Sequence, residues 1–255
     1  MLELYHWEPT LHSGEPLISL AEKQLPFESR YVDLLQLQQH EPDFLRLNPT
    51  GQVPVLVHDG RTITESGLIL EYLEDTFPER PLRPQSLAER YEARSWIKYV
   101  EERMAAYVCL LGWLQFTRPT LPRTTLERAR HTSGRLPPER RELWQKALDA
   151  AYTPQETAFV REALAFAVAK LERALQGSAW LAGEAYSIAD IALVPTVRAL
   201  RAVASEIVNA QRSPRTLEWL ARAEQRPGFQ LALAHARTPA PDRIFAPGSE
   251  PARWG

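Results

Sequence analysis

Cysteine is nearly absent from this sequence of 255 residues, because Cys109 is the only one. A single cysteine excludes a disulfide within the chain, so a reducing, cytoplasmic location is the simplest expectation. The six histidines contain no HxxxH pair, and the sequence has no CxxC motif. Since zinc sites are commonly built on such spacings, we expect no metal site.

An excess of charge of one sign is also absent, with 30 basic and 32 acidic residues and a formal net charge of −2. This balance gives no reason to expect binding to nucleic acid or to an anionic membrane. The longest apolar run, residues 105–114, is shorter than the roughly 20 residues that span a bilayer. The N-terminus has acidic residues and no apolar core, so we expect no signal peptide.

Two signatures of common enzyme classes are missing. The sequence has no GxGxxG motif, which argues against a Rossmann cofactor site, and no GxSxG motif, which argues against an α/β-hydrolase site. Its composition, with 44% hydrophobic and 24% charged residues, is that of an ordinary globular protein.

The most informative stretch runs from Asn48 to Ser66, with the sequence NPTGQVPVLVHDGRTITES. A Pro-Thr-Gly turn precedes an apolar run at residues 53–57 whose length suits a strand. The pair Asp59-Gly60 favours a hairpin, and residues 62–64 are β-branched and continue as a second strand. Glu65-Ser66 then opens an amphipathic helix.

Pro54 breaks the strand pattern, because proline cannot donate a hydrogen bond to a sheet. A cis Val53–Pro54 bond is one way to accommodate it, and would turn the backbone groups of Val53 outward to pair with an extended peptide. At the helix start, Ser66 lies among free N–H groups that suit a carboxylate, and Glu65 can accept a hydrogen bond from an ammonium group. Together these residues favour a site for a small zwitterionic peptide. Each of them alone also fits an edge strand and an ordinary helix start.

With its VP and ES pairs, this stretch resembles the glutathione-binding half of the soluble glutathione transferases. The resemblance extends over nearly the whole chain. Residues 187–190 form a capping box like the one that opens the family's central buried helix, and residues 214–229 resemble a late helix of that family. The segment YHWEPTLHSGEP at residues 5–16, Gly112-Trp113 and residues 138–144 are most similar to the bacterial branch that cleaves lignin-type β-aryl ethers.

The resemblance implies an α/β thioredoxin-like N-terminal domain followed by an all-α helical C-terminal domain, the glutathione transferase fold. We expect the first domain at residues 1–78, a proline-rich linker at residues 79–87 and the helical domain at residues 88–255, with an irregular tail from residue 238. In the first domain, residues 14–23 are expected to form a helix with Ser13 as its N-cap. In the second, residues 87–113 should form one long helix, and residues 115–138, with four prolines, an irregular insertion.

The resemblance also implies which residues bind glutathione. His40, which follows Gln39, matches a contact with the glycyl carboxylate. Gln52 and Val53, beside Pro54, match residues that contact the peptide backbone, and Glu65 and Ser66 match those at the γ-glutamyl end.

The catalytic hydroxyl is expected in the loop before the first helix. A hydroxyl donor and a helix N-terminus both stabilise a thiolate. Ser13 falls on the serine of the β-etherase branch, whereas a shorter loop would place Thr10 there, so both remain candidates. His12 stands where that branch has an asparagine, and its role is open.

The helical domain is expected to supply an apolar pocket for a hydrophobic, aromatic electrophile. The candidate lining residues are Trp7, Tyr107, Trp113 and Phe116, although aromatic residues at these spacings fit a core equally well. Cys109 lies within an apolar helical segment and is expected to be inert. The resemblance further implies a homodimer.

We therefore predict a glutathione transferase, with glutathione as co-substrate, whose thiolate attacks a hydrophobic electrophile. Cleavage of β-aryl ethers, as in lignin degradation, is the specific reaction that the resemblance suggests. The alternatives are detoxifying conjugation or dehalogenation, a glutathione-dependent redox enzyme, and a non-catalytic glutathione-binding interaction module.

Overall fold

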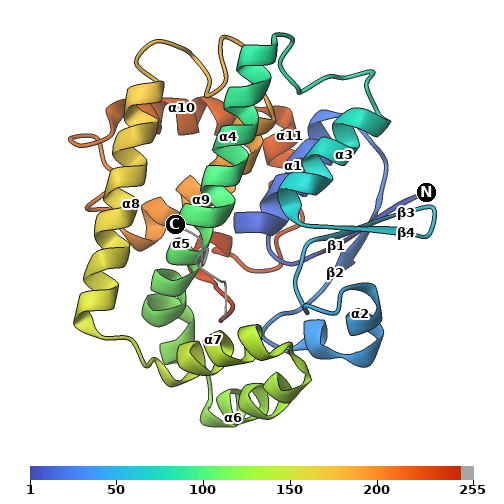
Figure 1. Ribbon diagram of the computed structural model, residues 1–255, viewed down its shortest axis with the longest axis vertical. Helices are drawn as coiled ribbons and strands as arrows, with labels where there is room; N and C mark the ends of the chain where they lie inside the picture. Colours follow the sequence, from blue (N-terminus) through green and yellow to red (C-terminus); the bar gives the residue numbers. More distant parts are fainter. Residues whose placement is uncertain (248–255) are drawn as a thin grey trace.

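A four-stranded sheet organises the N-terminal part of the computed structural model, which describes residues 1–247. The strands β1 (Leu2–His6), β2 (Glu28–Tyr31), β3 (Val55–His58) and β4 (Arg61–Thr64) lie in the order β2-β1-β3-β4. β2 runs parallel to β1, whereas β3 and β4 are antiparallel to their neighbours (Figure 1). Asp59 and Gly60 have φ values of 48° and 82° in the turn between β3 and β4. Asp-Gly readily adopts this conformation, and the predicted hairpin is confirmed.

The two faces of the sheet are covered by different helices. Leu4 and Leu56 belong to the core cluster that contains residues of α1 (Leu11–Glu22) and α3 (Ser66–Thr76). Val55 and Val57 point to the other face and pack with Phe44 of α2 (Pro42–Leu47). This alternation follows from the two-residue period of a strand.

The start of α1 differs from the prediction. Thr10 is the N-cap residue, with extended backbone angles, and the helix begins at Leu11. The N–H of Gly14 already donates to the carbonyl of Thr10, so the helical ladder starts earlier than residue 14. The predicted N-cap role of Ser13 is therefore wrong.

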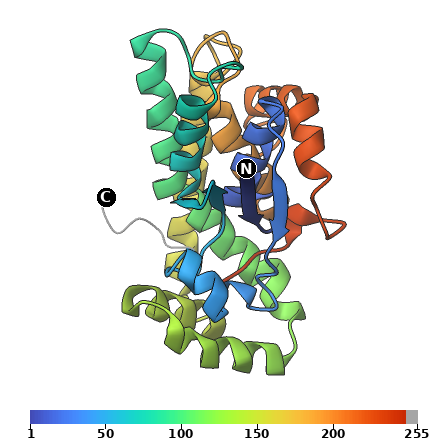
Figure 2. The same cartoon turned by 90° about the vertical axis from the view of Figure 1, so that its right-hand side faces the viewer.

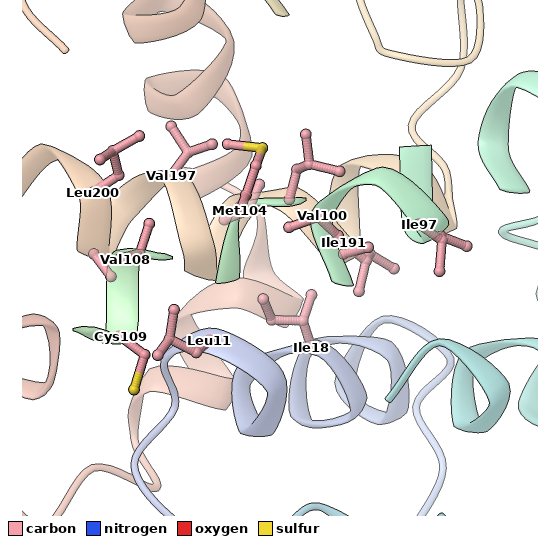
Figure 3. Close-up of a cluster of buried hydrophobic side chains, with 14 of the residues drawn as sticks. Leu11, Ile18, Ile97, Val100, Met104, Val108, Cys109, Ile191, Val197 and Leu200 are labelled. Atoms are coloured by element: carbon pink, nitrogen blue, oxygen red, sulfur yellow. The ribbon is translucent and has the colours of Figure 1, made fainter. Parts of the chain in front are cut away.

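The second half of the described chain is helical. Its first helix, α4 (Leu87–Arg103), was expected to continue to residue 113, but the backbone departs from helical angles at Met104 before α5 (Ala105–Gly112) begins. α8 (Pro154–Ala174) lies beside α4 and α5, and the central α9 (Ile188–Val203) is buried along most of its length. Figure 3 shows α9 at the centre of the core, where its side chains face residues of α1, α4 and α5.

The capping box that was predicted before α9 is present. The Ser187 hydroxyl accepts a hydrogen bond from the N–H of Ala189, and Asp190 accepts one from the N–H of Ser187 at 2.9 Å. Asp190 also accepts hydrogen bonds from Leu181 N–H and from Trp219 Nε1, which belongs to α10 (Pro214–Glu224). The box therefore fixes the loop before α9 and a neighbouring helix as well.

The expected irregular insertion at residues 115–138 is instead largely ordered. A π-helical turn at residues 113–117 leads to α6 (Arg123–Thr132), which packs against α7 (Pro138–Asp149). The prolines flank these helices, at positions where a missing N–H costs little, and so do not interrupt them. The pair α6–α7 lies next to α2 and the segment before it (Figure 2).

The chain ends by returning to the N-terminal part. After α11 (Pro227–Leu233), the backbone N–H groups of Arg237 and Thr238 donate to the buried carboxylate of Glu8. The tail that was expected to be irregular contains one 3-10 turn at Pro241–Arg243, and residues 248–255 of that prediction lie outside the described residues. The domain boundaries at residues 78 and 88 stay a prediction. Within residues 1–247, no helix combines the length and apolar character needed to cross a membrane.

Candidate active site

Two buried hydroxyl groups lie at the start of α1. Oγ of Ser13 accepts a hydrogen bond from the backbone N–H of Trp7 at 3.1 Å, which leaves the hydroxyl proton for another acceptor. Oγ1 of Thr10 is also buried and has no hydrogen-bond partner within residues 1–247. Leu11, between them, has a φ of 45°, which a non-glycine residue rarely adopts. Both hydroxyls therefore remain candidates for the thiolate donor.

The predicted peptide-binding edge has the expected backbone geometry. The Val53–Pro54 peptide bond is cis, as predicted. β3 begins only at Val55, so Val53 lies outside the ladder and its backbone takes no part in the sheet. Asn48 Nδ2 donates to the carbonyl of Gln52 at 2.9 Å, which fixes the loop before the proline.

The start of α3 joins three helices. Glu65 is its N-cap residue and holds a φ of 66° and ψ of 117°, a region that marks functional sites more often than ordinary loops. Oγ of the buried Ser66 lies 3.2 Å from Nδ1 of His12 in α1. A carboxylate oxygen of Glu101 in α4 accepts a hydrogen bond from the N–H of Gly67 at 2.8 Å.

His12 and Glu15 form an ionisable pair beside this helix start, with Nδ1 of His12 3.2 Å from Oε1 of Glu15. Burial opposes a positive charge on His12, but the hydrogen bond to Glu15 and the charges of Glu15, Glu101 and Glu65 raise its pKa. Burial, together with the charge of Glu101, raises the pKa of Glu15 to about 7, although His12 and Ser66 counteract this. Both shifts favour protonation of the pair.

His40 and Gln39 lie beside the α6–α7 pair, and His40 contacts residues of both helices. Nδ1 of His40 is 3.3 Å from the Thr132 hydroxyl, its ring packs against Trp144, and Arg135 donates to its carbonyl at 3.0 Å. Burial and the charges of Arg140 and Arg135 lower the pKa of His40 to about 4, so its ring is neutral. Nε2 of His40 and Oε1 of Gln39 are buried without a partner among the described residues. Buried polar atoms without a partner fit a binding site in which a ligand would supply the missing hydrogen bonds.

The four aromatic residues predicted to line an electrophile pocket lie in different surroundings. Tyr107 lines a pocket of about 430 Å³ between α5, α7 and α8. Trp7 and Trp113 are buried, and the indole of Trp113 donates to the carbonyl of Ala147 in α7 at 2.8 Å. Phe116 stacks on Phe245 near the chain end. Their assignment as substrate contacts stays a prediction.

Several residues at the candidate site were not predicted from the sequence. Glu15 is fully buried and was given no role, although it lies in the segment of residues 5–16. Glu101 reaches the site from α4 and stands in no motif. Thr132 and Arg135 belong to the segment that was expected to be irregular. That segment is rich in arginine, which is the nearest signal in the sequence. Within residues 1–247, no group of three or more histidine, cysteine or acidic side chains is placed to hold a metal ion.

The chain is similar to protein-family models and to known proteins. The model of the glutathione S-transferase N-terminal domain matches residues 13–76, and that of the C-terminal domain matches residues 138–222. Protein LigF of Sphingobium sp. strain SYK-6 is 35% identical over 237 residues, which cover 90% of this chain and 91% of LigF. FtsZ-localized protein A of Caulobacter vibrioides is 29% identical over 91% of this chain and 90% of its own length.

Solved structures extend the similarity to the fold. The crystal structure of LigF, a beta-etherase, matches with a TM-score of 0.84 at 32% identity and covers 92% of this chain and 99% of LigF. A Burkholderia graminis glutathione transferase, with two glutathione molecules bound per subunit, matches with a TM-score of 0.71 at 28% identity, over 92% of this chain and 88% of that one. The predicted fold, a thioredoxin-like domain followed by a helical domain, is confirmed. The chain belongs to the glutathione S-transferase family.

Proposed function

We propose that this chain uses the thiolate of glutathione to cleave β-aryl ethers. In that step the sulfur forms a bond to the ether carbon, the carbon–oxygen bond breaks, and its electron pair leaves on a phenolate. The phenolate then takes the proton that the thiol released. The products are a glutathione thioether and a phenol, so no oxidant or reductant is consumed.

The similarity to LigF carries this proposal, because the beta-etherase and this chain are 35% identical over nine-tenths of each. The start of α1 suits the chemistry. A free thiol has a pKa of about 8.5, and about 1.4 kcal/mol of preferential thiolate stabilisation lowers it by one unit. Ser13 can supply a hydrogen bond to the sulfur because its oxygen already accepts one from Trp7. Such a donor does not need to accept the thiol proton itself.

Glutathione would lie on the N-terminal part of the chain, along the residues before β3 and at the start of α3. Its glycyl end would meet His40 and Gln39, its backbone would pair beside Gln52, Val53 and Pro54, and its γ-glutamyl end would meet Glu65 and Ser66. Losing one charge-assisted contact should weaken binding by about 1.5–3 kcal/mol. Calorimetric titration of Glu65→Ala and Ser66→Ala tests the last pair, and an unchanged affinity in both would remove that assignment.

The electrophile would lie against the helical domain. We assign Trp7, Tyr107, Trp113 and Phe116 to its surroundings, because aromatic side chains suit a bulky aryl ether. Tyr107→Ala tests the residue that lines the 430 Å³ pocket. A rise in KM for the ether, with glutathione affinity unchanged, would support the assignment, and an unchanged KM would contradict it.

The reaction is tested with a panel of β-aryl ethers, aryl halides, haloalkanes and epoxides, each assayed with glutathione. We expect wild-type protein to cleave the ethers, Ser13→Ala to lose roughly 10²-fold in rate, and Thr10→Val to retain activity. Loss of thiolate absorbance in Thr10→Val alone would move the role to Thr10. Turnover of halides or epoxides without ether cleavage would overturn the β-etherase proposal and leave general conjugation or dehalogenation.

Cys109→Ala provides a control for a redox mechanism. Cys109 is buried, and its Sγ donates to the carbonyl of Ala246 at 3.1 Å, so we expect the variant to keep its turnover. A folded Cys109→Ala protein without turnover would revive the redox alternative.

A non-catalytic glutathione-binding module is the second candidate, because the chain is also 29% identical to FtsZ-localized protein A, whose name states a location and no reaction. Binding of glutathione without turnover on any substrate of the panel would support this candidate. Ether cleavage by the wild-type protein would exclude it.

We also propose that the chain forms a homodimer. Leu68 of α3, Tyr91 of α4 and Phe159 and Phe166 of α8 are exposed. Exposed large apolar side chains are common at interfaces between subunits. Light scattering should then give twice the chain mass of 29.1 kDa, and a monomer mass would contradict the proposal.

A further inference from the structure

His12 connects the N-termini of α1 and α3. Its Nδ1 lies 3.2 Å from Oε1 of Glu15 and 3.2 Å from Oγ of Ser66, the first residue of α3. The His12 side chain is 33% exposed, whereas that of Glu15 is fully buried. These contacts fix one nitrogen of the imidazole, and the other, Nε2, has no hydrogen-bond partner within residues 1–247.

Carboxylates surround this imidazole. Glu15 faces it from α1, Glu65 from the start of α3, and Glu101 from α4. Their charges and the hydrogen bond to Glu15 outweigh burial and raise the pKa of His12, which favours the protonated ring. The site thus combines one cation with three acidic groups, which suits a ligand that carries a carboxylate next to an ammonium group.

Two observations indicate that a ligand would complete this site. Oε2 of Glu15 is buried and has no partner within residues 1–247, and a buried acceptor without a donor is costly. The N–H of Gly67 is already bound by Glu101 at 2.8 Å. The start of α3 therefore offers an incoming carboxylate fewer backbone donors than a free helix N-terminus would.

We propose that His12 binds the α-carboxylate at the γ-glutamyl end of glutathione through Nε2–H, while Glu15 holds the ring in position. The proposal rests on the proposed function, because it takes Ser66 as part of the glutathione site. The alternative is that His12 removes the thiol proton. The geometry favours binding of the carboxylate, since Nδ1 of His12 lies 3.2 Å from Oγ of Ser66 at the start of α3. Ser13, by contrast, accepts a hydrogen bond from the N–H of Trp7 and none from His12.

Calorimetry with two S-methylated peptides separates these roles, because neither peptide carries a thiol proton. One is S-methylglutathione, and the other is its analogue with a 4-aminobutanoyl group, which lacks the α-carboxylate. We expect His12→Gln to lower the affinity for S-methylglutathione at least tenfold, since a charge-assisted hydrogen bond is lost, and to leave the affinity for the analogue unchanged. His12→Asn, which is smaller, should behave alike. His131→Gln, at an exposed position of α6, is the control.

The pH dependence provides a second readout. Wild-type affinity for S-methylglutathione should fall as the pH rises through the raised pKa of His12, and this step should be missing in His12→Gln. Unchanged S-methylglutathione affinity in His12→Gln would overturn the proposal. Equal losses for both peptides would also overturn it, because the effect would then be structural. If the wild-type protein bound neither peptide, the proposed function itself would fail.

Discussion

Gly14 lies next to Ser13 in the first turn of α1, where the helix meets α9. A methyl group added at Gly14 would lie 2.8 Å from both Cβ and Cγ of Pro195 and 3.2 Å from the carbonyl carbon of Pro9. Carbon atoms normally approach to about 3.5–4.0 Å, so Gly14→Ala forces a displacement of roughly 0.7 Å or more. The proline ring is stiff, and α9 is buried around Pro195. We therefore expect the start of α1 to move.

The displacement should lower both stability and activity. Overpacking costs about 1–3 kcal/mol, and alanine in place of glycine within a helix returns up to about 1 kcal/mol. The net loss of unfolding free energy should then lie between about 0 and about 3 kcal/mol. A misplacement of about 1 Å at a catalytic group can cost about 10²-fold in rate. We expect kcat/KM of Gly14→Ala with glutathione to fall at least about tenfold.

Steady-state kinetics and thermal melting, run on the same preparations, measure the two effects. Gly134→Ala is a matched control, because a methyl group at Gly134 has no atom within 4 Å. It should retain wild-type kinetics and melting temperature. The reasoning would be refuted if Gly14→Ala matched wild type in kcat/KM, or if it lost activity only in proportion to unfolded protein.

Three further predictions concern buried polar groups. Asp190→Ala leaves three buried N–H donors without an acceptor and should lower the free energy of unfolding, measured in urea, by at least about 3 kcal/mol. Glu89→Ala, in the more exposed capping box of α4, is the control and should lower it by about 1 kcal/mol or less. Equal losses in the two variants would contradict this prediction. Glu74→Ala leaves the buried ammonium of Lys23, now 2.6 Å from Glu74, without its carboxylate and should cost about 3–5 kcal/mol, so a wild-type urea midpoint would disprove it. Burial lowers the pKa of His6 from 6.5 to about 4, so the unfolded chain binds more protons between these pH values. The stability advantage of wild type over His6→Gln should therefore shrink by about 3 kcal/mol as the pH falls from 6.5 to 4, and a constant difference would refute the assignment.

Features that depend on neighbouring residues could be predicted from the sequence. The Asp59-Gly60 turn needs positive φ at two adjacent positions, and that pair of residues tolerates it at low cost. The capping box before α9 depends on residues three positions apart. The start of α3 at Glu65-Ser66 follows in the same way from the end of the strand before it.

Features that depend on distant contacts could not be predicted. Glu101 reaches the N–H of Gly67 across 34 positions of sequence, and nothing in α4 marks that residue for the contact. α6 was missed because the prolines of its segment were taken as helix breakers, although Pro122 is the N-cap residue of α6 and Pro138 lies in the first turn of α7. As a result, the contacts of Thr132 and Trp144 with His40 were not foreseen.

The proposed site places two helix N-termini against one ligand. α1 offers Ser13 near its start and α3 offers Ser66, and the contact of His12 with Ser66 fixes the distance between them. A helix N-terminus carries about half a positive charge, so two of them side by side favour a ligand with two anionic groups. Glutathione has three anionic groups when its thiol is ionised, and in the proposed site two of them, the thiolate and the glutamyl carboxylate, would face these helix starts. Because α9 packs against α1 and α4 supplies Glu101, the helical half sets this spacing as much as the sheet does.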